Sequence, residues 1–579
     1  MRSNIQITML AVLLAVFAVQ AVGGIWNNAA TYDEVAHLPA GYAYIRKGDF
    51  RFNPEHPPLV KMLAALPLLT MEIPPVEQNP HWNSNNEWLF GRYFLYHSGI
   101  NADNAIFLGR LPMVLLGILL GFLVFKWSQE IYGTGAGLFS LFLFCFEPNV
   151  IASSQVIHTD LGFSLFLVLS LYLFWKAMQE PSRKRFILAG MSFGLALSTK
   201  FTALILIPVY LALILLYLFE DRAAFAFRRF LFRKEDRLTL RLRLYFALSS
   251  FALLLLTAMI VLIISYGFTS VGRYFDGLSF VLDHNRKGNP AFLFGMYSDS
   301  GWWYYFLLAF AVKTPIPVII IFASALLSFG RDLFKNFKTP GNFYLLIPVL
   351  LLLFFTAAGR INIGLRHILP VYPLLFIFSG RLFSFIGSST SKANSTSLII
   401  IFALLLWLLG SAIFIFPHHL AYFDELAGGP SNGYKYLADS NLDWGQDLIR
   451  LKKFLQEEGE DSVILSYLGS ADPNYYGIKY QYLPGYGLNS PQDYRIKFKR
   501  KEFVAISATN LQSVFFNTRD TFDWLKEKEP CARIGYSIFV WEISKDREAH
   551  RNLARLYREF GMPDLSKKHE KSAANEKEW

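Results

Sequence analysis

Leu398–Phe416 reads LIIIFALLLWLLGSAIFIF, an apolar run without a charged residue. Roughly 20 such residues cross the hydrocarbon core of a bilayer as a helix. Ile5–Ile25 (IQITMLAVLLAVFAVQAVGGI) has the same character, and similar stretches recur between these two, giving about eleven in all. With 53% hydrophobic and 17% charged residues among 579, the chain is too apolar for a soluble protein. The sequence predicts an all-α polytopic membrane protein that retains Ile5–Ile25 as its first span.

Positive charge sets the predicted orientation in the membrane. The formal net charge is +11, but the basic residues gather in short loops between apolar stretches, which favours a topological role over a nucleic-acid partner. Those loops are Lys176–Arg185, Arg222–Arg243, Arg331–Lys338 and Arg381–Lys392. If they and the N-terminus are cytoplasmic, the outer segments are residues 26–103, 149–160, the turn near Lys200, 267–303, 357–369 and the region from Pro417.

Beyond Pro417 the composition becomes that of a soluble domain, in which polar helical segments alternate with short β-like runs. These runs are Ser462–Tyr467, Glu502–Ser507 and Ala532–Ile543. The predicted organisation is a transmembrane domain over 1–416, a small extracytoplasmic α/β domain over 417–545, and a charged tail over 546–579. The tail is poor in large apolar residues after Leu556, so we expect it to fray or be disordered.

The first outer loop, residues 26–103, is rich in Pro, Trp, His and acidic residues, which a plain connector does not need. It opens with TYDEVAHLPAGYAY (31–44), which places Asp33 and Glu34 side by side where the chain leaves the membrane. An isolated pair of acids is most often solvated surface charge. The context of this pair favours half of an active site.

The same loop continues with GDFRFNPEHPPLVKMLAALPLL (48–69), in which Glu55, His56 and Lys61 flank a double proline. Two consecutive prolines fix the local backbone direction and present these groups rigidly. A proline-terminated surface helix with incidental charges is the plain alternative.

These two segments resemble the protein O-mannosyltransferases of glycosyltransferase family 39, through the DE pair after the first span and the HPPLxK-like sequence that follows it. The lipid A aminoarabinose transferases are similar too. Further matching segments extend the resemblance over most of residues 1–450: GRLPMVLLG (109–117), VIHTDLGF (156–163), ALSTKFTAL (196–204), GWWYYFLLAFAVKTPIP (301–317), NIGLRHILPVYPLL (362–375) and SNLDWGQDL (440–448). The last three are similar to bacterial phospholipid-carrier-dependent glycosyltransferases. The resemblance implies the GT-C architecture, a bundle of membrane helices with its catalytic centre in the first outer loop.

By this resemblance Asp33 matches the catalytic carboxylate, which takes the proton of an acceptor hydroxyl. Attack at the anomeric carbon then inverts its configuration, and no second acid is needed because a phosphate leaves without strong protonation. Glu34 is expected to orient the acceptor or the first outer loop. Glu55 and Asp160 are expected on the acceptor side or behind the catalytic residues.

A leaving lipid phosphate requires cations near its oxygens. Arg110, in an RxP context at the outer end of the second span, matches the family's carrier-phosphate arginine; a snorkelling interfacial arginine is the alternative. Other candidates near the outer boundary, not all of which are needed, are His56, Lys61, Lys200, Arg366 and His367. The aminoarabinose transferases have a lysine at the position of His56, so a phosphate role there depends on protonation of the imidazole.

Three other features leave alternatives open. Lys313 falls inside an apolar span, where it lines the path of the carrier or pairs with a buried acid. The aromatic run 302–305 either stacks on sugar or isoprenoid or forms an interfacial aromatic belt. We favour the belt. The segment DSNLDWGQD contains Asp439, Asp443, Trp444 and Asp447. These residues bind an acceptor, a glycan or a metal, or they form turns and helix caps. We favour turns and caps.

The function implied is an inverting membrane glycosyltransferase that moves a monosaccharide, with mannose as one candidate, from a polyprenyl phosphate to an extracytoplasmic hydroxyl. The acceptor is a protein, a lipid or a glycan. We expect a bacterial cytoplasmic membrane, an active site on the outer face, and a dimer as one oligomeric candidate. No cofactor is certain, since oligosaccharyltransferases of this architecture use a divalent cation and protein mannosyltransferases are not thought to, so metal ligands stay unassigned.

The runner-up is a transporter or flippase for a lipid-linked sugar. Transporters often have duplicated halves and charges spread through their helices, whereas the polar residues here cluster in the outer loops. An oligosaccharyltransferase is disfavoured because the chain lacks a WWD-type motif in its soluble domain.

Overall fold

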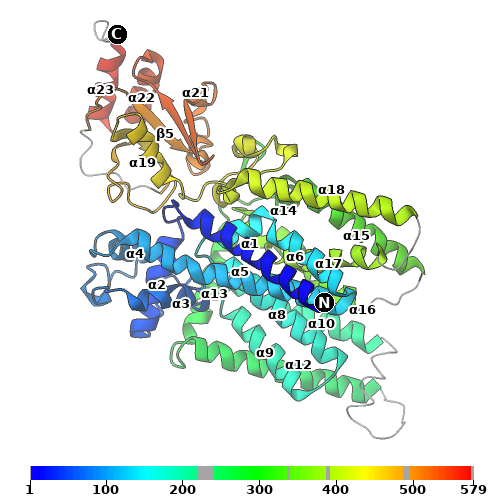
Figure 1. The fold of residues 1–579 in the computed structure, drawn as a ribbon. Coiled ribbons are helices and arrows are strands. Elements are labelled where there is room, and N and C mark those ends of the chain that lie inside the picture. The colour runs from blue at the N-terminus through cyan, green and yellow to red at the C-terminus, as the bar shows by residue number, and fades with distance from the viewer. Residues whose placement is uncertain (1, 220–239, 336–339, 387–391, 488–495, 575–579) are drawn as a thin grey trace.

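A computed structural model describes residues 2–219, 240–335, 340–386, 392–487 and 496–574. A bundle of helices forms the larger part, and a small sheet with its own helices lies at one end (Figure 1). The helices of the bundle are α1 (Arg2–Ile25), α5 (Ala102–Tyr132), α6 (Thr134–Cys145), α7 (Pro148–Ser153), α8 (Thr159–Gln179), α9 (Arg183–Leu197), α10 (Leu206–Phe219), α12 (Leu240–Ser265), α13 (Gly272–Lys287), α14 (Tyr305–Lys313), α15 (Ile316–Lys335), α16 (Pro340–Ala357), α17 (Val371–Ile386) and α18 (Lys392–Ile415).

Six described helices are long and apolar enough to cross a bilayer: Asn4–Ile25, Ala102–Tyr132, Thr159–Gln179, Leu244–Ser265, Ile316–Leu333 and Thr396–Ile415. Large apolar side chains on the bundle stay exposed, as expected for a lipid-facing surface. Examples are Val19 (71% exposed), Leu350 (65%) and Ile399 (68%). The predicted multi-span membrane protein is confirmed. The predicted number of about eleven spans stays a prediction, because further apolar helices such as Thr134–Cys145 fall below full spanning length.

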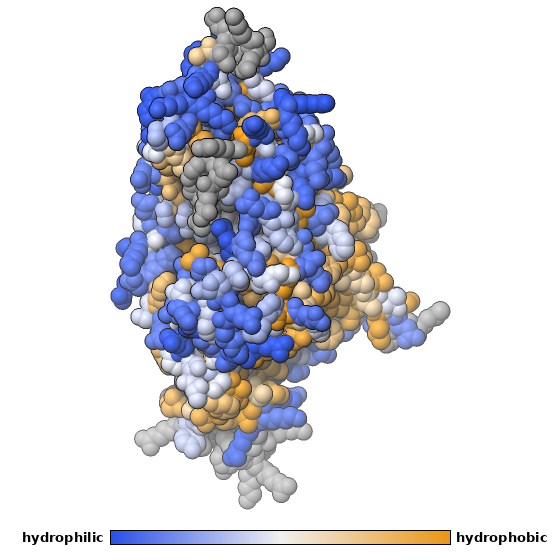
Figure 2. Space-filling view, turned by 90° about the vertical axis from the view of Figure 1, so that its left-hand side faces the viewer, coloured by the Kyte–Doolittle hydropathy of each residue, from blue (hydrophilic) through white to orange (hydrophobic). Residues whose placement is uncertain are grey.

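The first outer loop is folded rather than extended. It contains α2 (Glu34–Lys47), α3 (Leu59–Ala65) and α4 (Glu87–Tyr96) between α1 and α5. These helices lie at the same end of the bundle as the C-terminal region, while the N-terminus lies at the other end (Figure 1). Seen from this end, hydrophilic residues cover the C-terminal region and the centre, and hydrophobic residues line the flank of the bundle (Figure 2).

The C-terminal region contains a five-stranded mixed sheet in the order β4-β3-β5-β7-β6. Its strands are β3 (Ser462–Ser466), β4 (Lys479–Tyr482), β5 (Phe503–Ser507), β6 (Ala532–Ile534) and β7 (Ile538–Glu542), and β3 pairs in parallel with β4 and β5. The helices α19 (Leu448–Glu457), α20 (Ala508–Leu511) and α21 (Asp523–Lys526) accompany it. The predicted small α/β region is confirmed, although β4 and a hairpin of β1 (Ala291–Leu293) and β2 (Met296–Ser298) were not predicted.

The prediction of a frayed or disordered tail over 546–579 is wrong for the described residues to 574. They form α22 (Arg547–Glu559) and α23 (Pro563–Ala574). Ala549, Leu553 and Tyr557 are buried, because a spacing of four residues brings all three to one face of the helix. The Asp546 carboxylate accepts a hydrogen bond of 2.9 Å from the Ala549 amide, which caps α22.

Candidate active site

A cavity of about 430 Å³ opens between the first outer loop, α13, the end of α16 and the loop that follows it. Its polar wall holds Asp33, His37, Asn53, Glu55, His56, Lys200, Arg366 and His367. Its apolar wall includes Leu204, Ile205, Leu278, Val281, Leu282, Leu352 and Phe355. A pocket of this kind can hold a charged head group against its polar wall and an apolar chain against the adjoining apolar wall.

Asp33 and Arg366 meet at the polar end of this cavity. Asp33 precedes the first residue of α2, and Arg366 lies in the short helix η4 (Leu365–Ile368). The Arg366 Nη1 is 2.9 Å from the Asp33 Oδ2, and the two side chains are 15% and 18% exposed. The Asp33 carboxylate is thus paired with a guanidinium and still partly accessible from the cavity.

Asp160 lies behind this pair, in the first turn of α8. Its carboxylate contacts the Lys200 ammonium and the His158 Nδ1, the latter at 3.0 Å, and lies 3.8 Å from the Arg366 Nη1. Arg366 is therefore held between two carboxylates. The structure brings Asp33, Asp160, Lys200 and Arg366 together from four distant segments.

Glu34 points away from the cavity and forms a buried ion pair with Arg110. The Arg110 Nε and Nη2 donate to the Glu34 Oε1 and Oε2 at 2.8 and 2.6 Å, and the side chains are 1% and 0% exposed. Glu34 also accepts from the amides of Thr31 and Ile157. Neither Glu34 nor Arg110 lines the cavity described above.

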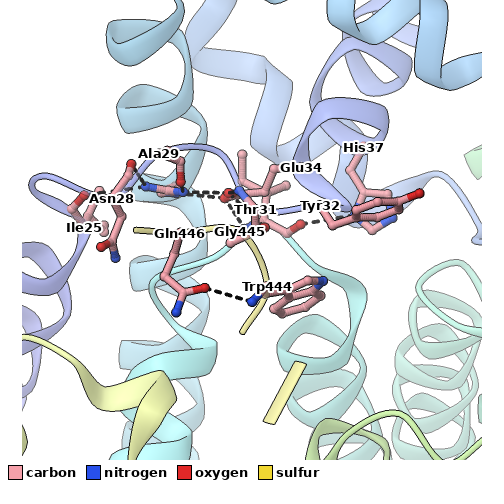
Figure 3. A network of polar contacts seen from close by, with 12 residues as sticks. Ile25, Asn28, Ala29, Thr31, Tyr32, Glu34, His37, Trp444, Gly445 and Gln446 are labelled. Carbon is pink, nitrogen blue, oxygen red and sulfur yellow. Dashed lines mark hydrogen bonds and ion pairs between the residues drawn. The ribbon is translucent and has the colours of Figure 1, made fainter. Parts of the chain in front are cut away.

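The remaining donors of Arg110 bind the backbone. They reach the carbonyls of Ile25, Asn28 and Ala29 at 3.5, 3.0 and 2.8 Å. Figure 3 shows Glu34 together with Ile25, Asn28 and Ala29 in this network. The phosphate role predicted for Arg110 stays a prediction, and its contacts in this structure instead fix the start of the first outer loop. Glu34 also bonds within this loop, to Thr31, and its two predicted roles stay predictions.

Lys61 is also used within the loop. Its buried ammonium donates to the Tyr44 hydroxyl and to the carbonyls of Asn53 and His56, at 2.8, 2.8 and 2.7 Å. These bonds hold the NPEHPP turn, so that Glu55 and His56 face the cavity. Lys61 itself does not line it.

The surroundings of the NPEHPP turn shift the pKa values of Glu55 and His56. Burial, with Asp33 and Glu87 nearby, raises the pKa of Glu55 to about 7. Burial, with His37 and Lys200 nearby, holds the pKa of His56 well below its ordinary value. His56 is therefore neutral near pH 7, which removes the protonation that a phosphate role would need.

Sequence reasoning missed His37, which lines the cavity one helical turn after Asp33. Its Nδ1 lies 3.1 Å from the Ile157 carbonyl, and burial lowers its pKa to about 4. The spacing of four residues from Asp33 on a helix was a usable signal. Trp88, at the start of α4, also lines the cavity and had no such signal.

The features left open by the sequence lie outside the cavity. The Lys313 ammonium donates to the Leu420 carbonyl at 2.9 Å and to the Asn441 carbonyl, so it joins the bundle to the C-terminal region. Of the aromatic run, Trp303 is 69% exposed. Asp443 and Asp447 accept hydrogen bonds from Thr509 and Ser537 within the C-terminal region.

The carboxylates of Asp33 and of Asp160 behind it do not fit a divalent metal. Asp33 and Asp160 already face Arg366 and Lys200, and a metal would have to compete with these cations. Among the described ranges, no group of three His, Cys, Asp or Glu side chains is arranged to hold a metal ion.

Residues 100–232 match the model of a family described as dolichyl-phosphate-mannose-protein mannosyltransferase. The match includes Arg110, Asp160 and Lys200, and the predicted resemblance to protein O-mannosyltransferases is confirmed over this part of the chain. No curated protein matches the chain significantly.

Several solved structures are similar in chain path. The apo crystal structure of ArnT from Cupriavidus metallidurans is 13% identical, with a TM-score of 0.47, over 93% of this chain and 98% of its own. The same protein bound to undecaprenyl phosphate is 13% identical, with a TM-score of 0.45, over 94% and 99%. The Saccharomyces cerevisiae Pmt1–Pmt2 complex bound to the sugar donor is 20% identical, with a TM-score of 0.35, over 46% of this chain and 34% of its own.

Proposed function

We propose that this protein is a membrane glycosyltransferase of the GT-C class that transfers a sugar from a polyprenyl phosphate to an acceptor hydroxyl with inversion. The observation that carries the proposal is the pairing of Asp33 with Arg366 at the polar end of a cavity whose adjoining wall is apolar. Such a cavity accommodates a sugar phosphate at one end and an isoprenoid chain along the other wall. The family match over residues 100–232 supports the same reaction class.

Asp33 is the proposed general base. It takes the proton of the acceptor hydroxyl while the hydroxyl oxygen bonds to the anomeric carbon. The bond between that carbon and the phosphate oxygen breaks, and both of its electrons leave with the polyprenyl phosphate. The sugar is then on the acceptor in inverted configuration, and Asp33 carries the proton until water removes it.

Arg366 is the proposed main cation for the leaving phosphate. Among the described residues, its Nε and the Nε2 of His367 are buried without a hydrogen-bond partner, and both side chains line the cavity. A buried unpaired donor is costly unless a ligand satisfies it. A carrier phosphate oxygen would accept from the Arg366 Nε, while Lys200 adds positive charge from its position beside Asp160.

Replacing Arg366 tests this assignment. We expect Arg366→Gln to raise the KM for a polyprenyl-phosphate sugar by roughly 10- to 100-fold, because a charge-assisted bond to phosphate contributes about 1.5–3 kcal/mol. Initial rates with radiolabelled donor and membranes containing the full chain measure this change. Arg360→Gln is the matched control, since Arg360 is exposed on the same loop. An unchanged KM for Arg366→Gln would contradict the assignment.

The pKa of Glu55 predicts a pH dependence. Below about pH 7 the neutral carboxylic acid can donate a hydrogen bond to the phosphate, and above it the carboxylate repels the phosphate. Donor KM should therefore rise severalfold between pH 6 and pH 8, within the rough span of one unit on either side of this pKa. Glu55→Gln stays neutral and should flatten that rise. A profile for Glu55→Gln identical to that of the wild type would exclude Glu55 as its source.

A further inference from the structure

Residues 440–446 of the C-terminal region run between the two loops that carry the proposed catalytic pair. On one side, the Trp444 carbonyl accepts from the Tyr32 amide at 2.8 Å, and the Gln446 carbonyl accepts from the Ala29 amide at 2.9 Å. Figure 3 shows Trp444, Gly445 and Gln446 beside the loop that contains Ala29, Thr31 and Tyr32. Backbone bonds therefore fix this segment against the residue that precedes Asp33.

On the other side, the same segment holds the loop of Arg366. The Ser440 Oγ donates to the Ile363 carbonyl at 2.8 Å. The Asn441 Oδ1 accepts from the Leu365 amide at 3.0 Å, adjacent to Arg366. The segment is thus bonded to the immediate neighbours of both members of the pair.

Trp444 also contacts the guanidinium of Arg366 directly. The Arg366 Cζ lies 4.2 Å from the centroid of the indole ring, and Trp444 is 5% exposed. A guanidinium over a buried indole face is held by cation–π attraction. This contact restricts the guanidinium while its Nη1 contacts Asp33 and its Nε remains without a protein partner.

The segment is anchored firmly enough to act as a support. Gly445 adopts φ +88°, and a Cβ there would lie 2.8 Å from the Tyr467 hydroxyl and 2.9 Å from the Gly469 Cα, so only glycine allows this close packing. The Asp443 Oδ2 accepts from the Thr509 amide at 2.9 Å. Asp443 and Gly445 thus fix the backbone on both sides of Trp444 against the sheet region.

We propose that Trp444 is a positioning residue that orients Arg366 toward the carrier phosphate, so that the C-terminal region completes the donor site. This inference rests on the proposed function, in which Arg366 binds that phosphate. It assigns to the SNLDWGQD motif a role in catalysis that acts through Arg366. Trp444 itself need not touch the substrate.

A double-mutant cycle on the full-length protein in detergent tests the inference, with undecaprenyl phosphate as the probe. We expect Trp444→Leu to weaken its binding by roughly 10- to 30-fold, the range for a desolvated cation–π contact. Trp444→Phe, which keeps an aromatic face, should bind more tightly than Trp444→Leu. In an Arg366→Gln background, Trp444→Leu should cause no further loss, because residues that act through one another are not additive.

Trp524→Leu is the matched control, since Trp524 is another tryptophan of the C-terminal region with a cation, Lys528, over its ring. It should bind undecaprenyl phosphate as the wild type does. Thermal unfolding is followed for every variant, and Trp444→Met replaces Trp444→Leu if the latter does not fold. Equal losses from Trp444→Leu in both backgrounds would indicate a merely structural role and overturn the inference. Failure of the wild type itself to bind undecaprenyl phosphate would contradict the proposed function as well.

Discussion

Asp33→Asn should lower kcat by about 10²- to 10⁴-fold, the contribution of a positioned general base. The amide keeps the shape of the carboxylate but does not accept the proton of the acceptor hydroxyl. The KM for the donor should not rise, because the neutral amide no longer competes with the phosphate for Arg366, which lies 2.9 Å from Asp33 in the present structure. Initial rates of the purified protein over a range of donor concentrations separate these two effects.

The control for this substitution is Asp276→Asn. Asp276 lies on α13, a helix that borders the cavity, but its side chain is 66% exposed and pairs only with Arg273 among the described ion pairs. It should leave kcat and KM unchanged. A kcat for Asp33→Asn equal to that of the wild type would remove Asp33 as the base, whereas a raised donor KM would indicate that it positions Arg366 instead.

Arg110→Met should destabilise the protein by about 3–5 kcal/mol, because it leaves the Glu34 carboxylate buried and unpaired. Both side chains are almost fully buried, and Arg110 also donates to the carbonyl at the end of α1 and to two carbonyls of the first outer loop. Thermal unfolding in detergent measures the loss. Adding Glu34→Gln to Arg110→Met should restore part of the stability, since the isolated charge is removed.

This variant also separates two roles of Arg110. If the arginine binds the carrier phosphate, as its RxP context suggests, Arg110→Met would keep wild-type stability and lose donor affinity. If it supports the loop, stability falls and the folded fraction retains much of its donor affinity. The contacts described above predict the second outcome.

The sequence predicted the class of fold because long apolar runs have few structural alternatives. It also predicted β3 and β5, and a single run that the structure divides into β6 and β7, because these segments are rich in β-branched and aromatic residues. It did not predict α22 and α23, because their apolar face is built from alanine, single leucines and a tyrosine among many charges. Such a face can be recognised only when Ala549, Leu553 and Tyr557 are considered together at their helical spacing.

For the site, the sequence named charged residues that the structure places near one another, and it left their pairing undetermined. Asp33, Lys200 and Arg366 all carry motif signals and do meet at one cavity. The pairing of Glu34 with Arg110 depends on how the first outer loop lies against α5, a tertiary contact without a periodic pattern. Likewise, the contact of Trp444 with Arg366 joins the C-terminal region to a loop of the bundle, and turn-forming residues gave no indication of it.

The most direct test of this account follows a radiolabelled sugar supplied on polyprenyl phosphate to membranes that contain the full chain. The account predicts that the label leaves the carrier and appears in an acceptor fraction with wild type and Asp276→Asn, but not with Asp33→Asn. Label that crosses the membrane while still attached to its carrier would indicate a transporter. Transfer by Asp33→Asn at the wild-type rate would contradict the catalytic role of the cavity's Asp33–Arg366 pair.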